Sequence, residues 1–261
     1  MAQTSGVRLL NNSRFYILNG SILLSVAVFS WLRIQISSDQ LFFIRAEQVF
    51  GLLCVGYWYL ALTISPIGYV VGKQRTKRLE FSRRAIGVSA FYFALLHAAI
   101  ALWGQLGGFT QLQYLPSLFQ WSLLGGLVAF VILLIMAATS FDKVVKIMTF
   151  RKWKWLHRLV YIGGILAVFH IWSVGTHISY GGIRVAALVA LIILAGLELY
   201  RVTKLLNDKY LHLDRTESLT VYVVLWAIVS TLILLFPTVI QNYHSQHMEH
   251  GDASSHRKEA Q

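Results

Sequence analysis

Three histidines lie within or at the edge of segments that are apolar enough to cross a membrane. His97 follows "FYFALL", while His157 and His170 flank "RLVYIGGILAVF" and lie thirteen positions apart. A polar ring in hydrocarbon costs free energy unless it has a partner, so ionisable side chains at this depth indicate a functional site. Neutral imidazole is also a common ligand of transition metals. Metal ligation is therefore the first chemistry to consider.

The depth of each ring follows from the rise of its helix. At about 1.5 Å per residue, His97 lies roughly 20 Å from Arg84 at the inner edge of its span, and His170 roughly 24 Å from Lys154. Two imidazoles at matching depth on parallel helices can ligate one haem iron from opposite faces. The alternative is that each ring is a hydrogen-bonded core residue. His157 lies only about 4–5 Å inside the inner edge.

The elements that must position these rings are membrane helices. The 261 residues are 56% hydrophobic and 13% charged, with a mean hydropathy of +0.60, whereas a soluble domain carries about 25% charged residues. A spanning helix needs about 20 mostly apolar residues. The sequence therefore predicts an all-α, polytopic bundle of about seven transmembrane helices, centred in 16–34, 48–71, 85–104, 119–139, 155–174, 184–202 and 219–240. We expect the first to be a retained helix rather than a cleaved signal peptide.

The basic residues predict the orientation of the bundle. With a cytoplasmic N-terminus over 1–15 and a transmembrane domain over 16–241, 18 of the 23 Lys and Arg lie on the inner side, as the positive-inside rule requires. The polar tail, 242–261, then lies outside. The net charge of +12 is explained by orientation and by contact with anionic membrane lipid. We expect no nucleic-acid partner, because no soluble basic domain is large enough to dock a duplex.

Several other chemistries are excluded or left without support. The single cysteine, Cys54, cannot form an intramolecular disulfide or a Cys-ligated zinc or iron–sulfur site. The chain has no P-loop, no nucleotide-binding glycine fingerprint and no Ser-His-Asp arrangement, and its non-membrane segments are too short for a flavin or nicotinamide domain. No catalytic acid or base is predicted.

The C-terminal tail carries a second group of histidines. His244, His247 and His250 are spaced by three in "NYHSQHMEHGD", so a helix that continued past the membrane would keep them on one side. Clustered imidazole and carboxylate suit Cu, Ni, Zn or Fe. The alternative is a solvated polar end.

Two segments of the sequence resemble a known family. "RRAIGVSAFYFALLHAAIALW" (83–103) and "LVAFVILLIMAATSFDKVVKIMTFRKWKWLHRLVYIGGILAVFHIWSV" (127–174) are similar to the ferric reductase-like transmembrane domain. The nearest branch is the short bacterial haem-binding subunit of the periplasmic methionine sulfoxide reductase system. The shared features are an arginine pair opening a helix that contains "LH", a "TS" ending the next span, and "W..LHRLVY" leading to a second histidine. The resemblance covers about residues 40–180.

The resemblance implies a membrane cytochrome b that contains one or two b haems. His97 and His170 would ligate an outer haem, and His157 an inner haem near the cytoplasmic face. Four-histidine members of the family have the second inner ligand where this chain has Arg83, so that ligand is not identified; His212, on the inner side, is a candidate.

The resemblance also implies partners and a compartment. The chain would be an electron-transfer subunit of an oxidoreductase in the bacterial inner membrane. Its donor would be a cytoplasmic flavin reductase or membrane quinol, and its acceptor a periplasmic oxidoreductase or a metal ion. Arg83, Arg84 and Arg158 would pair with haem propionates or with an anionic flavin of the partner.

Two other functions and one geometric problem stay open. The intramembrane histidines and the tail also suit a metal or cation transporter, and the bundle also suits a haem-free assembly subunit. Thirteen residues on a straight helix turn about 220°, so His157 and His170 would not share a face. We expect tilt, a bend near Gly163–Gly164 or laterally offset haems to absorb this rotation.

Overall fold

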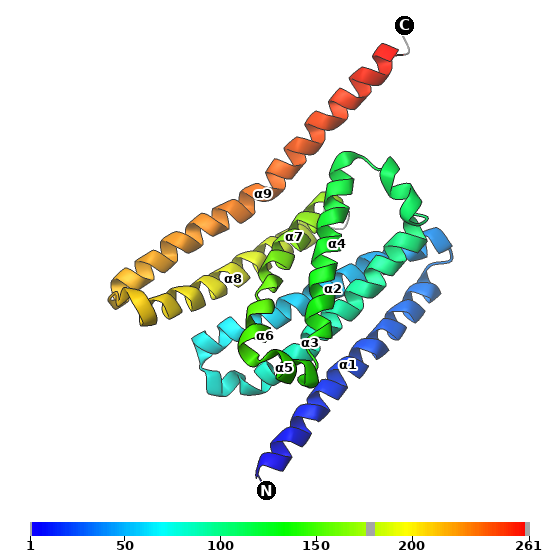
Figure 1. Ribbon diagram of the computed structural model, residues 1–261. Coiled ribbons are helices and arrows are strands. Elements are labelled where there is room, and N and C mark those ends of the chain that lie inside the picture. The colour runs from blue at the N-terminus through cyan, green and yellow to red at the C-terminus, as the bar shows by residue number, and fades with distance from the viewer. Residues whose placement is uncertain (1, 176–180, 259–261) are drawn as a thin grey trace. The chain divides into compact units, whose positions relative to one another are not determined.

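The computed structural model describes the backbone of residues 2–175 and 181–258, and the side chains of 13–175 and 181–242. All regular structure in this part of the chain is helical, which confirms the predicted all-α class. The chain divides after Gly175 into two compact units (Figure 1). Each unit is described by itself.

Seven segments of the described chain are long and apolar enough to cross a membrane, which confirms the predicted number. Each overlaps the span expected from the sequence, and most extend further by several residues. The protein is a multi-pass membrane protein whose spans are Ser13–Gln35, Asp39–Val71, Lys73–Gln105, Ser117–Ala138, Phe150–Val174, Gly181–Leu211 and Arg215–Asn242.

The first unit is organised around α3 (Lys73–Ala99), which packs against α1 (Ala2–Gln35), α2 (Asp39–Val71) and α4 (Ser117–Ala138) (Figure 1). Gly72 reverses the chain between α2 and α3 with a φ of 98°, a conformation that is strained for any residue with a Cβ atom. α3 continues into a π-helical turn (η1, Ile100–Gln105), and a short 3-10 helix (η2, Phe109–Tyr114) precedes α4.

Small polar and aromatic side chains fill the contacts of α3. Phe93 on α3 and Phe50 on α2 are fully buried, and their rings stack with centroids 6.2 Å apart. Ser21 on α1 donates a hydrogen bond to Ser89 on α3, with 2.8 Å between the hydroxyl oxygens. Small residues and interhelical hydrogen bonds are typical of helix contacts in membranes, where lipid removes the hydrophobic drive for helices to associate.

The fifth span is interrupted, and this changes the predicted geometry of His157 and His170. After α5 (Asp142–Met148), the chain forms α6 (Phe150–Leu156), turns at His157–Arg158 and continues as α7 (Leu159–Val174), which packs against α4. Gly163 and Gly164 lie within the continuous helix α7, so the helix is interrupted at His157–Arg158 and not at the glycines.

The second unit contains α8 (Gly181–Leu206), a π-helical turn (η4, Asn207–Leu211) and α9 (Arg215–Lys258). Asn207 closes the connection: its amide oxygen accepts a hydrogen bond from the Leu213 N–H at 2.7 Å, and its amide nitrogen donates to the Leu213 carbonyl at 3.2 Å. The last described span continues without interruption into the C-terminal tail.

Trp226 joins the two long helices of this unit. Its indole N–H donates to the Ile192 carbonyl at 3.2 Å. The ring lies against Gly196, where an added Cβ would approach the indole nitrogen to 2.8 Å. The contact therefore requires a residue without a side chain at position 196.

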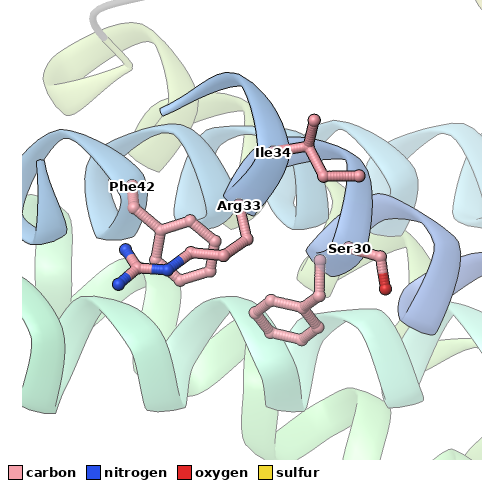
Figure 2. A pocket seen from close by; sticks show the side chains of 5 residues that line it. Ser30, Arg33, Ile34 and Phe42 are labelled. Atoms are coloured by element: carbon pink, nitrogen blue, oxygen red, sulfur yellow. The ribbon is translucent and has the colours of Figure 1, made fainter. Parts of the chain in front are cut away.

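A shallow groove lies on the first unit where α1 and α2 meet. It is lined by Phe29, Ser30, Arg33, Ile34 and Phe42 (Figure 2). The Arg33 guanidinium lies 5.4 Å from the centre of the Phe42 ring and forms an ion pair with Asp39 at 2.7 Å. No histidine lines this groove, so it is separate from the site described next.

Candidate functional site

The structure brings His97 and His170 together. His97 lies in the last turn of α3 and His170 in the second half of α7. Their ring centroids are 6.2 Å apart and their planes make an angle of 81°. Two side chains 73 positions apart in sequence therefore face each other at one level of the bundle.

Each of the two rings is held through its Nδ1 atom by a neighbouring helix. His97 Nδ1 lies 3.1 Å from the Glu47 carbonyl oxygen on α2, and His170 Nδ1 lies 3.0 Å from the Ser122 carbonyl oxygen on α4. A carbonyl only accepts, so Nδ1 carries the proton in both rings and Nε2 has a lone pair. A hydrogen bond of this kind fixes the tautomer and orientation of a metal-ligating histidine.

A glycine supports each ring, four residues after the residue that holds its Nδ1. A Cβ added to Gly51 would lie 3.0 Å from His97 Nδ1, and one added to Gly126 would lie 2.8 Å from His170 Nδ1. The two histidines are thus seated in the same way, on α2 and on α4. Each seat depends on the absence of a side chain at the glycine.

The arrangement fits an iron between two axial imidazoles. A metal–imidazole bond is about 2 Å long, and the ring centre lies roughly 1 Å behind its nitrogen, so two axial rings on one metal have centroids about 6 Å apart. The 6.2 Å separation agrees with this. Among the described residues, neither Nε2 atom has a hydrogen-bond partner. The donor set and its supporting hydrogen bonds are therefore suited to haem.

His157 does not join this pair. Its Nε2 lies 3.2 Å from the Thr139 hydroxyl, and its ring packs against Trp153 at a tilt of 34°, with centroids 4.0 Å apart. The Trp153 indole donates to the Thr139 carbonyl at 2.9 Å. Thr139 is the first residue of the "TS" that ends the fourth span, so one residue of this motif contacts both His157 and Trp153.

His157 belongs to a polar and aromatic cluster that we call the inner cluster, after the predicted orientation. It consists of Thr139, Asp142, Trp153 and His157 with Arg14 and Arg84. Asp142 bridges Arg14 and Arg84 at 2.8 and 2.7 Å, and Arg84 lies 5.0 Å from the centre of the Trp153 ring. Partial burial alone would raise the pKa of Asp142, but the two guanidinium groups outweigh it and hold the pKa below its usual range.

The other predicted arginines occupy different positions. Arg83 donates through Nε to the Ala61 carbonyl on α2 at 2.8 Å. The Arg158 side chain is exposed at the turn before α7 and makes no ion pair within the described part of the chain. The three predicted anion-binding arginines therefore differ. Arg84 is paired with a carboxylate, Arg83 is hydrogen-bonded to the backbone of α2, and Arg158 is exposed on the surface.

The remaining predicted ligands belong to the second unit. His212 caps η4 with a left-handed backbone, φ 51°. The backbone of α9 is helical through the positions of His244, His247 and His250, as the spacing by three requires. Their side chains lie outside the described residues. Among the described residues there is no group of three or more His, Cys, Asp or Glu side chains that could hold a metal ion.

Sequence reasoning missed Glu47, Gly51 and Ser122. Glu47 had a usable signal, because a carboxylate inside an apolar span is rare. Gly51 and Ser122 had none, because small residues are common wherever membrane helices touch. Gly126 is a residue of the same kind, and it contacts the His170 ring.

Comparison with known proteins identifies the family of the chain. The family model for the ferric reductase like transmembrane component matches residues 17–168. The chain belongs to this family. The matched segment contains His97 and His157 and ends just before His170. No solved structure matches the chain with significance.

Several curated bacterial proteins are similar to the family segment. The chain is 30% identical over 146 residues to the protein-methionine-sulfoxide reductase heme-binding subunit MsrQ of Ralstonia nicotianae, covering 53% of this chain and 65% of that protein. It is 31% identical over 173 residues to MsrQ of Polaromonas naphthalenivorans, covering 63% and 76%. It is 34% identical over 115 residues to MsrQ of Herminiimonas arsenicoxydans, covering 43% and 52%. The match thus spans just under two thirds of the Ralstonia protein.

Proposed function

We propose that this chain is a membrane cytochrome b that passes electrons through the bilayer as the haem-binding subunit of an oxidoreductase. The observation that carries the proposal is the His97–His170 pair, with ring centroids 6.2 Å apart and both Nδ1 atoms bonded to backbone carbonyls. The similar MsrQ proteins are heme-binding subunits by name, which supports haem as the ligand.

The residues of the site have separate tasks in this proposal. His97 and His170 would hold the haem iron through their Nε2 atoms. The Glu47 and Ser122 carbonyls keep both rings in the tautomer that has a lone pair on Nε2, and Gly51 and Gly126 leave room for the rings. Haem b, when bound, supplies a site that takes up and releases one electron. No side chain is required to act as a catalytic acid or base.

The partners follow from the proposed orientation. With the N-terminus in the cytoplasm and the C-terminus in the periplasm of a bacterial inner membrane, the electron enters near the inner cluster and leaves near the His97–His170 pair. The donor is a cytoplasmic flavin reductase or membrane quinol, and the acceptor is a periplasmic oxidoreductase or a metal ion. Arg158 is exposed and forms no ion pair within the described part of the chain. Arg158, with Arg83 and Arg84, contacts either the haem propionates or anionic groups of the donor.

A second haem on the inner side is a separate part of the proposal. Its ligand would be His157, whose Nε2 would exchange the Thr139 hydroxyl for iron. The exchange is feasible because the Thr139 hydroxyl also donates to the Ile135 carbonyl at 2.7 Å, so it keeps a partner when His157 leaves. No second inner ligand is assigned.

The decisive measurement is a reduced-minus-oxidised spectrum of the purified full-length protein, with haem per chain counted as pyridine haemochrome. We expect a b-type spectrum with one or two haems per chain. The nearly perpendicular rings further predict a strongly anisotropic low-spin EPR signal rather than the rhombic signal of parallel imidazoles. Absence of haem after expression with excess haem would overturn the proposal and favour a cation transporter or an assembly subunit.

A further inference from the structure

The surroundings of the two candidate haem ligands differ in one respect, which is the side chain that lies beside Nδ1. At His97, the Glu47 carboxylate oxygen Oε1 lies 3.0 Å from Nδ1, in addition to the backbone carbonyl at 3.1 Å. At His170, the Ser122 hydroxyl lies 3.4 Å from Nδ1, in addition to the backbone carbonyl at 3.0 Å. One ring therefore faces a carboxylate and the other a neutral hydroxyl.

The Glu47 carboxylate is held in place by a second helix. Its other oxygen, Oε2, accepts a hydrogen bond from the Gln105 amide at 3.3 Å. Gln105 closes the π-helical turn η1 that follows α3. The Glu47 carboxylate therefore connects α2 to η1. The hydrogen bond from Gln105 helps to keep it beside His97.

The surroundings strengthen the interaction between Glu47 and His97. The side chains of His97 and Glu47 are only 25% and 21% exposed. A charge-assisted hydrogen bond is roughly twice as strong as a neutral one, and it gains further where the local dielectric is low. The Ser122 hydroxyl interacts more weakly with His170, because it is neutral and lies 3.4 Å from Nδ1.

We propose that Glu47 is a positioning residue that makes His97 the more electron-donating of the two axial ligands and thereby lowers the reduction potential of the haem. The proposal rests on the function proposed above. A carboxylate that attracts the Nδ1 proton raises the basicity of the ligating Nε2. A more basic axial ligand and a nearby negative charge both favour the ferric over the ferrous state. The haem then gives its electron to an acceptor more readily.

A purely structural role for Glu47 would give different results. In that case Glu47 would only connect α2 to η1 through Gln105, and its charge would not matter. Glu47→Gln keeps the length of the side chain and an oxygen acceptor for the His97 Nδ1–H, but it removes the charge. Glu47→Asp keeps the charge and shortens the side chain. The two variants separate charge from shape.

The test is a spectroelectrochemical titration of the full-length, haem-loaded protein and its variants. The midpoint potential is read from bound haem alone, so a lower haem content in one variant does not obscure it. For Glu47→Gln we expect the ratio of reduced to oxidised haem at a fixed applied potential to rise roughly tenfold, which is about 59 mV for a one-electron couple. Ser122→Ala, the matched change at His170, should shift the ratio by much less.

The outcomes separate the two proposals. A higher midpoint for Glu47→Gln, with Glu47→Asp close to the unchanged protein and a larger greatest g value in the ferric EPR spectrum of the Gln variant, supports the inference. Equal midpoints in the unchanged protein and Glu47→Gln, or equal shifts in the Gln and Asp variants, would overturn it while leaving the haem assignment intact. If the unchanged protein binds no haem, the proposed function itself fails.

Discussion

His97 and His170, which form the outer pair in the proposed orientation, and His157 of the inner cluster have the same side chain in contrasting surroundings. His97 and His170 rest on glycines and are held by backbone carbonyls at Nδ1. His157 packs against Trp153 and uses Nε2 for the Thr139 hydroxyl. The first arrangement leaves the ligating nitrogens open, whereas the second occupies one. Residue type and depth alone therefore do not decide which intramembrane histidine is ready to bind iron.

The largest effect that tests this contrast is loss of the outer haem. We expect His170→Ala and His97→Ala each to abolish the b-type signal of that haem. Each substitution removes one of the two imidazole–iron bonds, and the remaining bond alone would not hold the haem. Haem per chain should fall by one. The measurement is the reduced-minus-oxidised spectrum together with the pyridine haemochrome count.

Two further substitutions complete this test. His157→Ala should leave the spectrum of the outer haem unchanged. If it lowers the haem content per chain, the lost haem is a second, inner haem. His212→Ala tests the other candidate ligand of an inner haem, and it too should leave the outer signal unchanged. Normal haem content in purified His170→Ala would refute the ligand assignment and remove the basis for the contrast.

An intermediate effect is expected from filling the space beside the His170 ring. In Gly126→Ala the new Cβ would lie 2.8 Å from Nδ1 and 3.1 Å from Cγ and Cε1, so the ring must shift. Overpacking of this kind costs about 1–3 kcal/mol, which corresponds to a loss of haem affinity of roughly five- to hundredfold. Haem titration of the haem-depleted protein measures it.

The matched control for this substitution is Gly164→Ala on α7, where an added Cβ meets nothing within 4 Å. We expect Gly164→Ala to bind haem as tightly as the unchanged protein. Equal haem affinities of the Gly126→Ala and Gly164→Ala proteins would mean that the His170 ring does not depend on the glycine beside it. The orientation of the His97 and His170 rings would then be no more restricted than that of His157.

Much of this architecture could be predicted from the sequence, because hydrocarbon imposes a simple rule on helix length. Runs of apolar residues of the required length gave the seven spans, and the rise of a helix gave matching depths for His97 and His170. Depth is one-dimensional, however. Which neighbouring helix would hold each ring depends on packing between spans far apart in sequence, so the contact of Glu47 with His97 was not predictable.

The break at His157 was also beyond the sequence. "WKWLHRLVY" contains no proline or glycine, which are the usual signals for a helix end. The turn coincides with tertiary contacts of Trp153 and His157 with Thr139, the first residue after α4. By contrast, the paired glycines in α7 suggested a bend, but Gly163 contacts Trp58 and Ile132 inside a continuous helix. Its role is close packing.

The smallest expected effect concerns the charges of the inner cluster. Asp142→Asn removes a carboxylate that bridges Arg14 and Arg84. The Asp142 side chain is 57% exposed, so solvent screens both pairs, and we expect the free energy of unfolding to fall by at most about 1 kcal/mol. Thermal unfolding followed by circular dichroism measures the change, with Asp39→Asn, which breaks the exposed pair with Arg33, as the matched control.

The pH dependence of this effect has a defined sign. The two arginines lower the pKa of Asp142 in the folded state, so its stabilisation is complete above the usual carboxyl range and disappears as the pH falls through the lowered pKa. The difference between the unchanged protein and Asp142→Asn should therefore be largest near neutral pH and vanish in acid. The outer haem spectrum at neutral pH should be the same in both proteins, because none of the contacts that hold His97 and His170 involves Asp142. A spectral change in Asp142→Asn would mean that the inner charges and the outer ligands form one connected network, and the contrast between the two regions would then have to be replaced by a single site that extends through the first unit.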